Sequence, residues 1–363
     1  MKARNPFTPT FGLVPPYLAG RDALLNTMAD AFESGLGNPN LCSLLIGPRG
    51  SGKTALLSCF GDEARRQGWL VVDVVAEEGM LEDVLQHVAA EASQIADVSS
   101  GRHLTGVSFG ELLGLEWETE ATEEPNWRMR MESLLAVLRD SGSGLLITVD
   151  EVRVDVDEMV RLASAYQLFV RAGLPVALSM AGLPVNVGDL VGDRRVSFLR
   201  RARQFVLGPI SDVEVSRAFR QTVVQAGKGI DDEALALATE AAQGFPYMMQ
   251  LVGYFMWAES AVEDLITPEG ARRGILDARE DFRTGVLERT WHEMSAGDRT
   301  FARAMLPDEG GSTLTDIARR MGKGTNYAST YKRRLMRAGV IGERPGGRLD
   351  FDIPLMRAYL AEQ

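Results

Sequence analysis

The fold of this chain is decided by one stretch, Leu44-Leu45-Ile46-Gly47-Pro48-Arg49-Gly50-Ser51-Gly52-Lys53-Thr54. An apolar run that begins at Leu41 leads into it, and a helix-forming run, Ala55-Leu56-Leu57, follows it. The stretch matches the pattern G-x-x-x-x-G-K-[ST] in the strand–loop–helix setting that the pattern requires. There the glycines let backbone N–H groups close around a phosphate, and the N-terminus of the following helix adds the positive end of its dipole. The stretch therefore predicts a site for a nucleoside triphosphate.

Two side chains of this loop have distinct expected roles. Lys53 is expected to reach the β- and γ-phosphates, and Thr54 is expected to ligate Mg²⁺. The alternative is a chance glycine turn before a surface helix, which the flanking strand and helix patterns disfavour. We expect the nucleotide to be bound by the loop and the first helical residues, Gly47, Pro48, Arg49, Gly50, Ser51, Gly52, Lys53, Thr54 and Ala55.

A second stretch supplies the acidic half of such a site. The apolar run from Gly144 to Val149 ends in Asp150-Glu151. An acid at the carboxyl end of a strand can hold Mg²⁺ together with Thr54, and the next acid can polarise the attacking water as a general base. We therefore assign Asp150 to the metal and Glu151 to the base. The alternative for each is a capping or salt-bridged surface acid.

Charge is distributed unevenly along the 363 residues, which carry a net charge of −11. From Ser312 to Gln363 there are ten Lys and Arg residues against five Asp and Glu residues, whereas the rest of the chain holds 29 against 45. An acidic body with a basic C-terminal segment predicts a polyanion partner at that end only.

The composition also bears on location. No apolar run approaches the roughly 18 residues of a membrane span, and the N-terminus has no apolar signal region. The two cysteines, Cys42 and Cys59, lack metal-ligand spacing and are expected to be buried thiols in a reducing compartment. We expect a cytoplasmic protein without a membrane partner.

Apolar strand and helix patterns alternate up to about residue 208, which predicts an α/β domain with a parallel sheet and flanking helices. The segment from Ser99 to Pro125 interrupts this rhythm with several glutamates and is expected to be a loop or insertion with a solvated acidic surface. From Ser211 to about Trp291 only helical patterns remain, four in number. We therefore predict three units, residues 1–208, an all-α unit at 209–291 and a third unit at 292–363.

The third unit has the pattern of a winged helix. Two short helices precede a third over Thr325 to Ala338, which is expected to turn Tyr327, Tyr331, Leu335 and Ala338 inward. Two strand patterns then flank Pro345-Gly346-Gly347 as a hairpin. If the third helix enters a DNA major groove, the expected contacts come from Asn326, Lys332, Arg333, Arg337, Arg344 and Arg348. The alternative is a winged helix that makes protein contacts or serves as an internal extension of the lid, with a basic face that is merely solvated.

Together these features resemble the AAA+ ATPases, in the branch shared with origin-recognition initiators and with helicase-loader-like ATPases of archaea and bacteria. The resemblance covers nearly the whole chain and includes Pro16-Tyr17-Leu18-Ala19-Gly20-Arg21 before the first helix. It implies ATP and Mg²⁺ as ligands, adenine close to Leu18–Arg21, and an oligomer in which a neighbouring subunit supplies an arginine finger. Arg200 and Arg201 are the candidates for that finger, although a solvated helix end explains them equally well.

Two positions depart from the family pattern. The polar sensor of the fourth strand has only Ser179 as a candidate, within Val176 to Gly182. In the lid, Gly244-Phe245-Pro246-Tyr247 places Tyr247 where the family has an arginine. The loss of that guanidinium removes one contact to the γ-phosphate, which predicts slow hydrolysis or a different coupling to lid closure. The same motif resembles the STAND class of signalling ATPases.

Two functions remain open at this point. The first is an ATP-hydrolysing AAA+ protein whose ATP or ADP state controls oligomerisation and the engagement of DNA or of an unidentified protein partner. The second is a STAND-like switch in which nucleotide gates a protein interaction and turnover is incidental. Glu151 and the basic winged helix favour the first, and Tyr247 favours the second. A chaperone-like motor is disfavoured, because the sequence shows neither a second ATPase cassette nor an aromatic pore loop.

Overall fold

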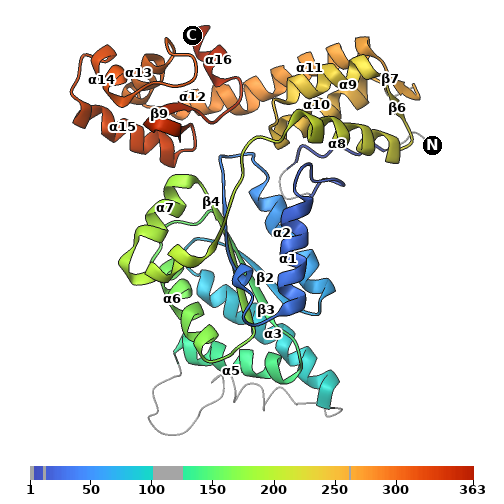
Figure 1. Ribbon diagram of the computed structural model, residues 1–363, viewed down its shortest axis with the longest axis vertical. Helices are drawn as coiled ribbons and strands as arrows, with labels where there is room; N and C mark the ends of the chain where they lie inside the picture. Colours follow the sequence, from blue (N-terminus) through green and yellow to red (C-terminus); the bar gives the residue numbers. More distant parts are fainter. Residues whose placement is uncertain (1–3, 11–13, 101–125, 261–262) are drawn as a thin grey trace.

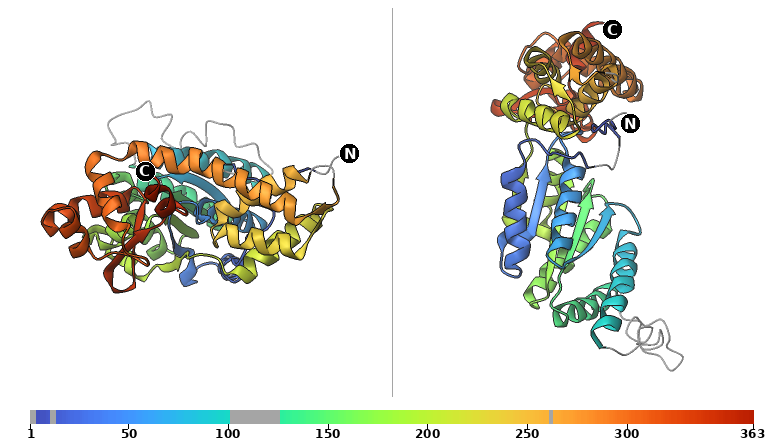
Figure 2. Two further views of the ribbon diagram at one scale, coloured as in Figure 1. Left: turned by 90° about the horizontal axis from the view of Figure 1, so that it is seen from above. Right: turned by 90° about the vertical axis from the view of Figure 1, so that its right-hand side faces the viewer.

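The computed structural model describes residues 4–10, 14–100, 126–260 and 263–363, without the side chains of 93–100. The predicted acidic insertion falls mainly on residues 101–125 and so lies outside the described part of the chain. Figure 1 shows an α/β domain with a helical lid and a winged helix side by side at one end of it, and the views in Figure 2 agree. Within the described residues no helix is long and apolar enough to cross a membrane.

The α/β domain is built on a parallel sheet of five strands in the order β2-β3-β4-β1-β5. The strands are β1 (Cys42–Ile46), β2 (Leu70–Val75), β3 (Leu145–Asp150), β4 (Val176–Gly182) and β5 (Arg203–Val206). β3 and β4 lie centrally and are buried almost throughout. Because β1 lies between β4 and β5, the loop after β1 leaves the carboxyl edge of the sheet next to the end of β4.

Helices cover both faces of this sheet. One face packs against α1 (Asp22–Ser34) and α2 (Lys53–Arg66). The other packs against α3 (Met80–Ser100), α5 (Trp127–Asp140), α6 (Asp157–Arg171) and α7 (Pro184–Gly192), with the 3-10 helix η2 (Arg194–Arg201) beside them. Successive strand residues point to opposite faces, so Leu44 joins one apolar cluster and Leu45 the other.

The lid contains the four predicted helices, α8 (Asp212–Gln225), α9 (Asp232–Ala242), α10 (Pro246–Glu259) and α11 (Pro268–Phe282). Ser211, Asp231 and Thr267 cap three of them through side-chain oxygens. The expectation of a lid without strands was wrong, because β6 (Gly229–Ile230) and β7 (Leu265–Ile266) pair in parallel. Strands of two residues are too short to produce an alternating pattern.

One continuous helical rod joins the lid to the winged helix. It consists of α11, a π-helical turn over Arg283–Glu288, and α12 (Arg289–Glu293). The rod ends before Ser295, which forms a capping box with Asp298 at the start of α13. One apolar cluster extends through both the lid and the winged helix. The division at residue 291 therefore remains a proposal from the sequence.

The C-terminal unit has the predicted winged-helix arrangement. It comprises α13 (Ala296–Met305), α14 (Leu314–Arg320), α15 (Thr325–Arg337), the antiparallel pair β8 (Ile341–Arg344) and β9 (Arg348–Phe351), and α16 (Met356–Ala361). The inward placement of Tyr327 was wrong, since 45% of this residue is exposed. Ala338 is exposed as well, whereas Leu335 is buried as predicted. Ala328 is also buried, and the Tyr331 ring packs over Gly297 of α13.

Candidate nucleotide-binding site

The glycine-rich loop closes tightly between β1 and α2. Gly50 and Gly52 have φ values of 72° and 88°, a region that glycine enters without a steric penalty. A Cβ atom on Gly50 would lie 2.7 Å from the ring of Phe245, the residue before α10. The loop therefore needs glycine here both for its backbone turn and for the close approach of the lid.

Lys53 lies inside this loop with only 6% of its surface exposed. Its Nζ donates hydrogen bonds to the carbonyl oxygens of Gly47 at 3.0 Å and Pro48 at 2.9 Å. Burial lowers the pKa of this ammonium, while the carboxylates of Glu151 and Asp150 act in the opposite direction. A buried cation at the N-terminus of α2 is suited to an anion such as phosphate.

The buried hydroxyl of Ser51 supports the same fit. Its Oγ has no hydrogen-bond partner within the described residues, although a buried polar atom normally has one. A phosphate oxygen bound in the loop can satisfy it.

Thr54, Asp150 and Glu151 come together at the carboxyl edge of the sheet. The Thr54 hydroxyl donates to Asp150 Oδ2 at 2.5 Å, and the Glu151 backbone N–H donates to Asp150 Oδ1 at 2.8 Å. Hydroxyl and carboxylate oxygens are hard ligands of the kind that Mg²⁺ takes, so this pair fits the expected metal. Glu151 has a φ of 52°, which is strained for a residue with a side chain, and such strain concentrates at functional sites.

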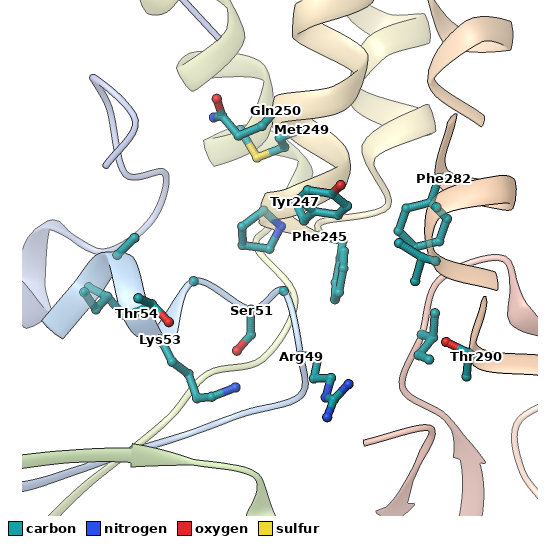
Figure 3. Close-up of a pocket in the computed structure, with 18 of the residues that line it drawn as sticks. Arg49, Ser51, Lys53, Thr54, Phe245, Tyr247, Met249, Gln250, Phe282 and Thr290 are labelled. Atoms are coloured by element: carbon teal, nitrogen blue, oxygen red, sulfur yellow. The ribbon is translucent and has the colours of Figure 1, made fainter. Parts of the chain in front are cut away.

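A cavity of about 870 Å³ opens over the loop, and part of its lining is drawn in Figure 3. Its walls come from the N-terminal segment, the glycine-rich loop with the start of α2, the end of β3, the lid, the rod and the winged helix. Glu151 lines it, and so do Tyr17, Leu18, Ala19 and Arg21 of the segment expected near adenine. Arg21 is held there by a 3.2 Å hydrogen bond from its Nη2 to the Gly208 carbonyl.

The lid contributes Phe245 and Tyr247 to the cavity. The Tyr247 ring lies 6.0 Å from the Phe282 ring, centroid to centroid, and burial raises the pKa of its hydroxyl. Figure 3 shows Phe245 and Tyr247 above the loop. Tyr247 thus occupies the predicted lid position and brings a neutral aromatic ring there.

Ser179 does not reach the cavity, contrary to its assignment as the polar sensor. Its side chain is fully buried, and its Oγ pairs with the Oγ of Ser43 at 2.9 Å. The reason is that β4 continues to Gly182, so Ser179 lies in the middle of the strand and not at its end.

The two candidate arginine fingers also lie outside this cavity. Arg200 and Arg201 are exposed at the end of η2, and Arg201 lines a separate hollow of about 310 Å³. Cys42 borders the same hollow, and burial raises the pKa of its thiol to about 12. A finger acts on a neighbouring subunit, so their role stays a prediction.

The winged helix forms a wall of the cavity that the sequence did not predict. Leu335, Ala338, Val340 and Ile353 line it. The turn after α15 comes so close that a Cβ on Gly339 would lie 3.3 Å from Cγ of Arg49 and 3.2 Å from the Leu183 side chain. Nearby, Arg337 of α15 forms an ion pair with Asp189 of α7, Nη2 to Oδ2, at 2.8 Å. No local pattern signals contacts between residues so far apart in the chain.

Four of the six predicted DNA contacts are engaged within the protein. Lys332 pairs with Glu343 at 3.1 Å, and Arg337 pairs with Asp189. Arg344 pairs with the largely buried Asp352 at 2.8 Å, and Arg348 donates to the Gly311 carbonyl at 2.6 Å. Within the described residues, Asn326 and Arg333 form no ion pair or side-chain hydrogen bond, and both are exposed.

Comparisons with known proteins agree with this architecture. The family described as "AAA ATPase domain" matches residues 17–177, and a domain of unknown function (DUF8462) matches residues 284–360. A comparison with curated proteins finds no match.

Solved structures extend the likeness over nearly the whole chain. A Walker-type ATPase of Pyrococcus abyssi is 14% identical with a TM-score of 0.64, and 95% of this chain and 96% of that chain are covered. Cdc6p of Pyrobaculum aerophilum is 14% identical with a TM-score of 0.50, covering 98% and 96%. The ORC2 protein of Aeropyrum pernix is 13% identical with a TM-score of 0.50, covering 98% and 95%. At these identities the likeness concerns the fold.

The sheet order, the glycine-rich loop and the family match converge on one assignment. Residues 17–177 match the AAA ATPase domain family, a match that implies ATP binding, and in this chain they are followed by a helical lid and a winged helix.

Proposed function

We propose that this protein binds and hydrolyses ATP with Mg²⁺ and that its nucleotide state controls the access of its winged helix to double-stranded DNA. One observation carries the proposal, namely that the winged helix forms part of the nucleotide cavity. Gly339 lies against Arg49 of the loop, and Arg337 pairs with Asp189. Because the two sites share a wall, a change in one alters the other.

The proposed chemistry rests on four side chains. Lys53 and the N-terminus of α2 bind the phosphates, and Thr54 and Asp150 hold Mg²⁺, which when bound neutralises phosphate charge. Glu151, exposed to the cavity, accepts a proton from the attacking water. Its strained backbone and the bond from its N–H to Asp150 fix its direction.

The proposed DNA surface is the exposed face of α15. Asn326, Thr330 and Arg333 are exposed there, and Lys323 lies over the ring of Tyr327 with its Nζ 5.7 Å from the ring centroid. Amide, hydroxyl and cationic groups on one helix suit a groove with phosphates on either side. Arg337 joins this surface when its pair with Asp189 opens.

The nucleotide part is tested by two substitutions. Lys53→Ala is expected to abolish ATP binding in calorimetry, because it removes the buried phosphate cation. Glu151→Gln is expected to retain ATP while turnover falls about 100-fold or more, the range of a lost general base. Unchanged phosphate release by Glu151→Gln would remove Glu151 from the base role.

The DNA part is tested by filter binding of duplex DNA at about 50 and 200 mM salt, in ATP analogue and in ADP. We expect tighter binding with the analogue, and a salt slope reduced by about one in Arg333→Ala. Arg273→Ala on α11, where Arg273 pairs with Glu259, is the matched control. The DNA proposal fails if binding is absent at low salt or if both variants behave alike.

A STAND-like switch is the second candidate, and Tyr247 favours it. A lid that brings no cation to the phosphates suits slow ATP turnover. In this alternative the bound nucleotide releases the winged helix from the cavity so that it can bind a protein. In either case ATP analogue is expected to favour a homo-oligomer in which Arg200 or Arg201 reaches a neighbouring cavity. Light scattering with the ATP analogue and with ADP measures the mass of the assembly. Equal masses in the two states would argue against an ATPase site that is completed by a neighbouring subunit.

A further inference from the structure

The lid brings no guanidinium to the phosphate side of the cavity at its expected position. A Cβ on Gly50 would lie 3.3 Å from Cβ of Tyr247, so Tyr247 starts directly against the loop. Its ring then turns towards Phe282, and its hydroxyl stays neutral because burial raises its pKa. The charge of a terminal phosphate therefore has no partner from this position.

Four arginines line the cavity, and two of them already have partners. Arg21 donates to the Gly208 carbonyl, and Arg334 pairs with Asp298 at 2.7 Å. The side chains of the other two, Arg49 and Arg289, form no ion pair or hydrogen bond within the part of the chain that the structure describes. The free guanidinium groups around the cavity are thus one from the loop and one from α12.

Arg49 is the better placed of the two. It belongs to the loop itself, and Figure 3 shows its side chain leaving the limb of the loop that faces Thr290, while Lys53 lies within the arch of the loop. Thr290, the neighbour of Arg289, lies across the cavity in that view. Lys53 senses Arg49 electrostatically, since after burial the charge of Arg49 further lowers the pKa of the Lys53 ammonium, against the effect of nearby carboxylates.

The winged helix fixes where the Arg49 side chain begins. Gly339 has a φ of 71°, and the space where its Cβ would be lies 3.3 Å from Cγ of Arg49. A larger residue at 339 would push the stem of Arg49 away. The turn after α15 thus directs this side chain while leaving its guanidinium free.

We infer that Arg49 supplies, from within the phosphate loop, the guanidinium that the lid lacks at Tyr247, and that it makes the site favour a triphosphate over a diphosphate. The inference rests on the proposed function, because it requires nucleotide at this loop. The planar guanidinium donates two parallel hydrogen bonds to phosphate oxygens. We assign this contact to the terminal phosphate of a triphosphate, a group that a diphosphate lacks.

The test is calorimetry on the full chain with Mg²⁺, using a non-hydrolysable ATP analogue and ADP. Arg49→Ala is expected to weaken binding of the analogue about 10- to 100-fold and that of ADP less than about threefold, as for one hydrogen bond to a charged group. Arg49→Lys is expected to recover part of the lost affinity, because lysine keeps the positive charge but cannot donate two parallel hydrogen bonds from a planar group. It also serves as the test variant if Arg49→Ala does not fold, which the thermal midpoint reports.

Three outcomes would overturn this inference while nucleotide still binds the wild type. Equal losses for analogue and ADP would mean that Arg49 only shapes the loop. Unchanged affinities would mean that it does not contact phosphate. A selective loss in Arg289→Ala, with none in Arg49→Ala, would give the role to the lid. A wild type that binds neither nucleotide would instead overturn the proposed function, and this inference with it.

Discussion

The positions of single residues follow from the sequence where a local motif determines them, while their roles stay predictions. The spacing of the loop from Gly47 to Thr54 brings Lys53 against the Gly47 carbonyl, and the end of β3 brings Asp150 to Thr54. Ser179 was misplaced because its position depends on where β4 ends, and an apolar run does not mark that end. The exposed Arg49 drew no separate prediction, since its neighbour Gly339 is distant in the chain.

Gly50 allows a prediction at this scale. Gly50→Ala is expected to lower stability by about 1–3 kcal/mol, because it combines a positive φ with overlap of the Phe245 ring. The same substitution is expected to weaken ATP binding by displacing the lid from the loop. Thermal unfolding and calorimetry measure the two effects.

Gly188→Ala is the matched control. Gly188 lies in α7 with nothing within 4 Å of its would-be Cβ, so this change is expected to raise stability by about 0.5–1 kcal/mol. A loss in Gly188→Ala as large as that in Gly50→Ala would refute the argument from crowding.

Elements were predicted from their periodicity, and this worked for the five strands and for most helices. It failed for β6 and β7, which are too short to show a period. It also failed to identify which residues of α15 are buried. Tyr327 and Tyr331 have the spacing of a buried stripe, yet only Tyr331 meets α13, and the two hydroxyls pair at 3.0 Å outside the core. Periodicity gives the face of a helix but not how far along the helix the neighbouring elements reach.

The winged helix should show a distinct response to acid. Hydrogen bonds lower the pKa of Asp308 from 3.8 to about 2, first from Arg320, which donates to both carboxylate oxygens at 2.7 Å, and then from Ser312. Since the folded pKa lies below the unfolded one, the contribution of this pair to stability is present above about pH 4. It is lost as pH falls towards 2.

Asp308→Asn is therefore expected to lower the thermal midpoint at pH 7 and to lie closer to the wild type at pH 2. Thermal unfolding followed across this range measures the difference. A gap between the two proteins that stays constant from pH 7 to pH 2 would contradict the assigned pair.

Across the whole molecule, the sequence predicted the order of the units but not how they meet. The family resemblance supplied a lid and a winged helix, whereas the pair between Arg337 and Asp189 joins residues 148 positions apart. Several charges predicted to face DNA are paired internally for the same reason. A basic sequence reveals charge, and only the folded chain reveals which charges are already neutralised.

The contact between α15 and α7 should limit DNA binding in ADP. Asp189→Asn is expected to raise DNA affinity in ADP by only about two- to fivefold, because an exposed ion pair contributes about 0.2–1 kcal/mol. The apolar contacts of Leu335, Ala338 and Val340 are expected to supply the remaining free energy that keeps the winged helix closed. Filter binding measures the change.

The exchanged pair Asp189→Arg with Arg337→Asp provides the control. It should restore the contact and return DNA affinity in ADP towards that of the wild type, apart from the loss of Arg337 itself as a phosphate contact. If Asp189→Asn leaves the affinity unchanged in ADP, the pair does not contribute to closure.

The rod from α11 through α12 has a mechanical consequence. Its segments of 15, 6 and 5 residues run without a break from the lid into the winged helix. At 1.5 Å per residue it is about 40 Å long, so a tilt of about 5° at the lid end swings the far end by about 3 Å. A displacement of this size is enough to break a hydrogen bond. A nucleotide that reseats Tyr247 of α10 and Phe282, which lies near the middle of the rod, would tilt the rod and so move the winged helix that carries the proposed DNA surface.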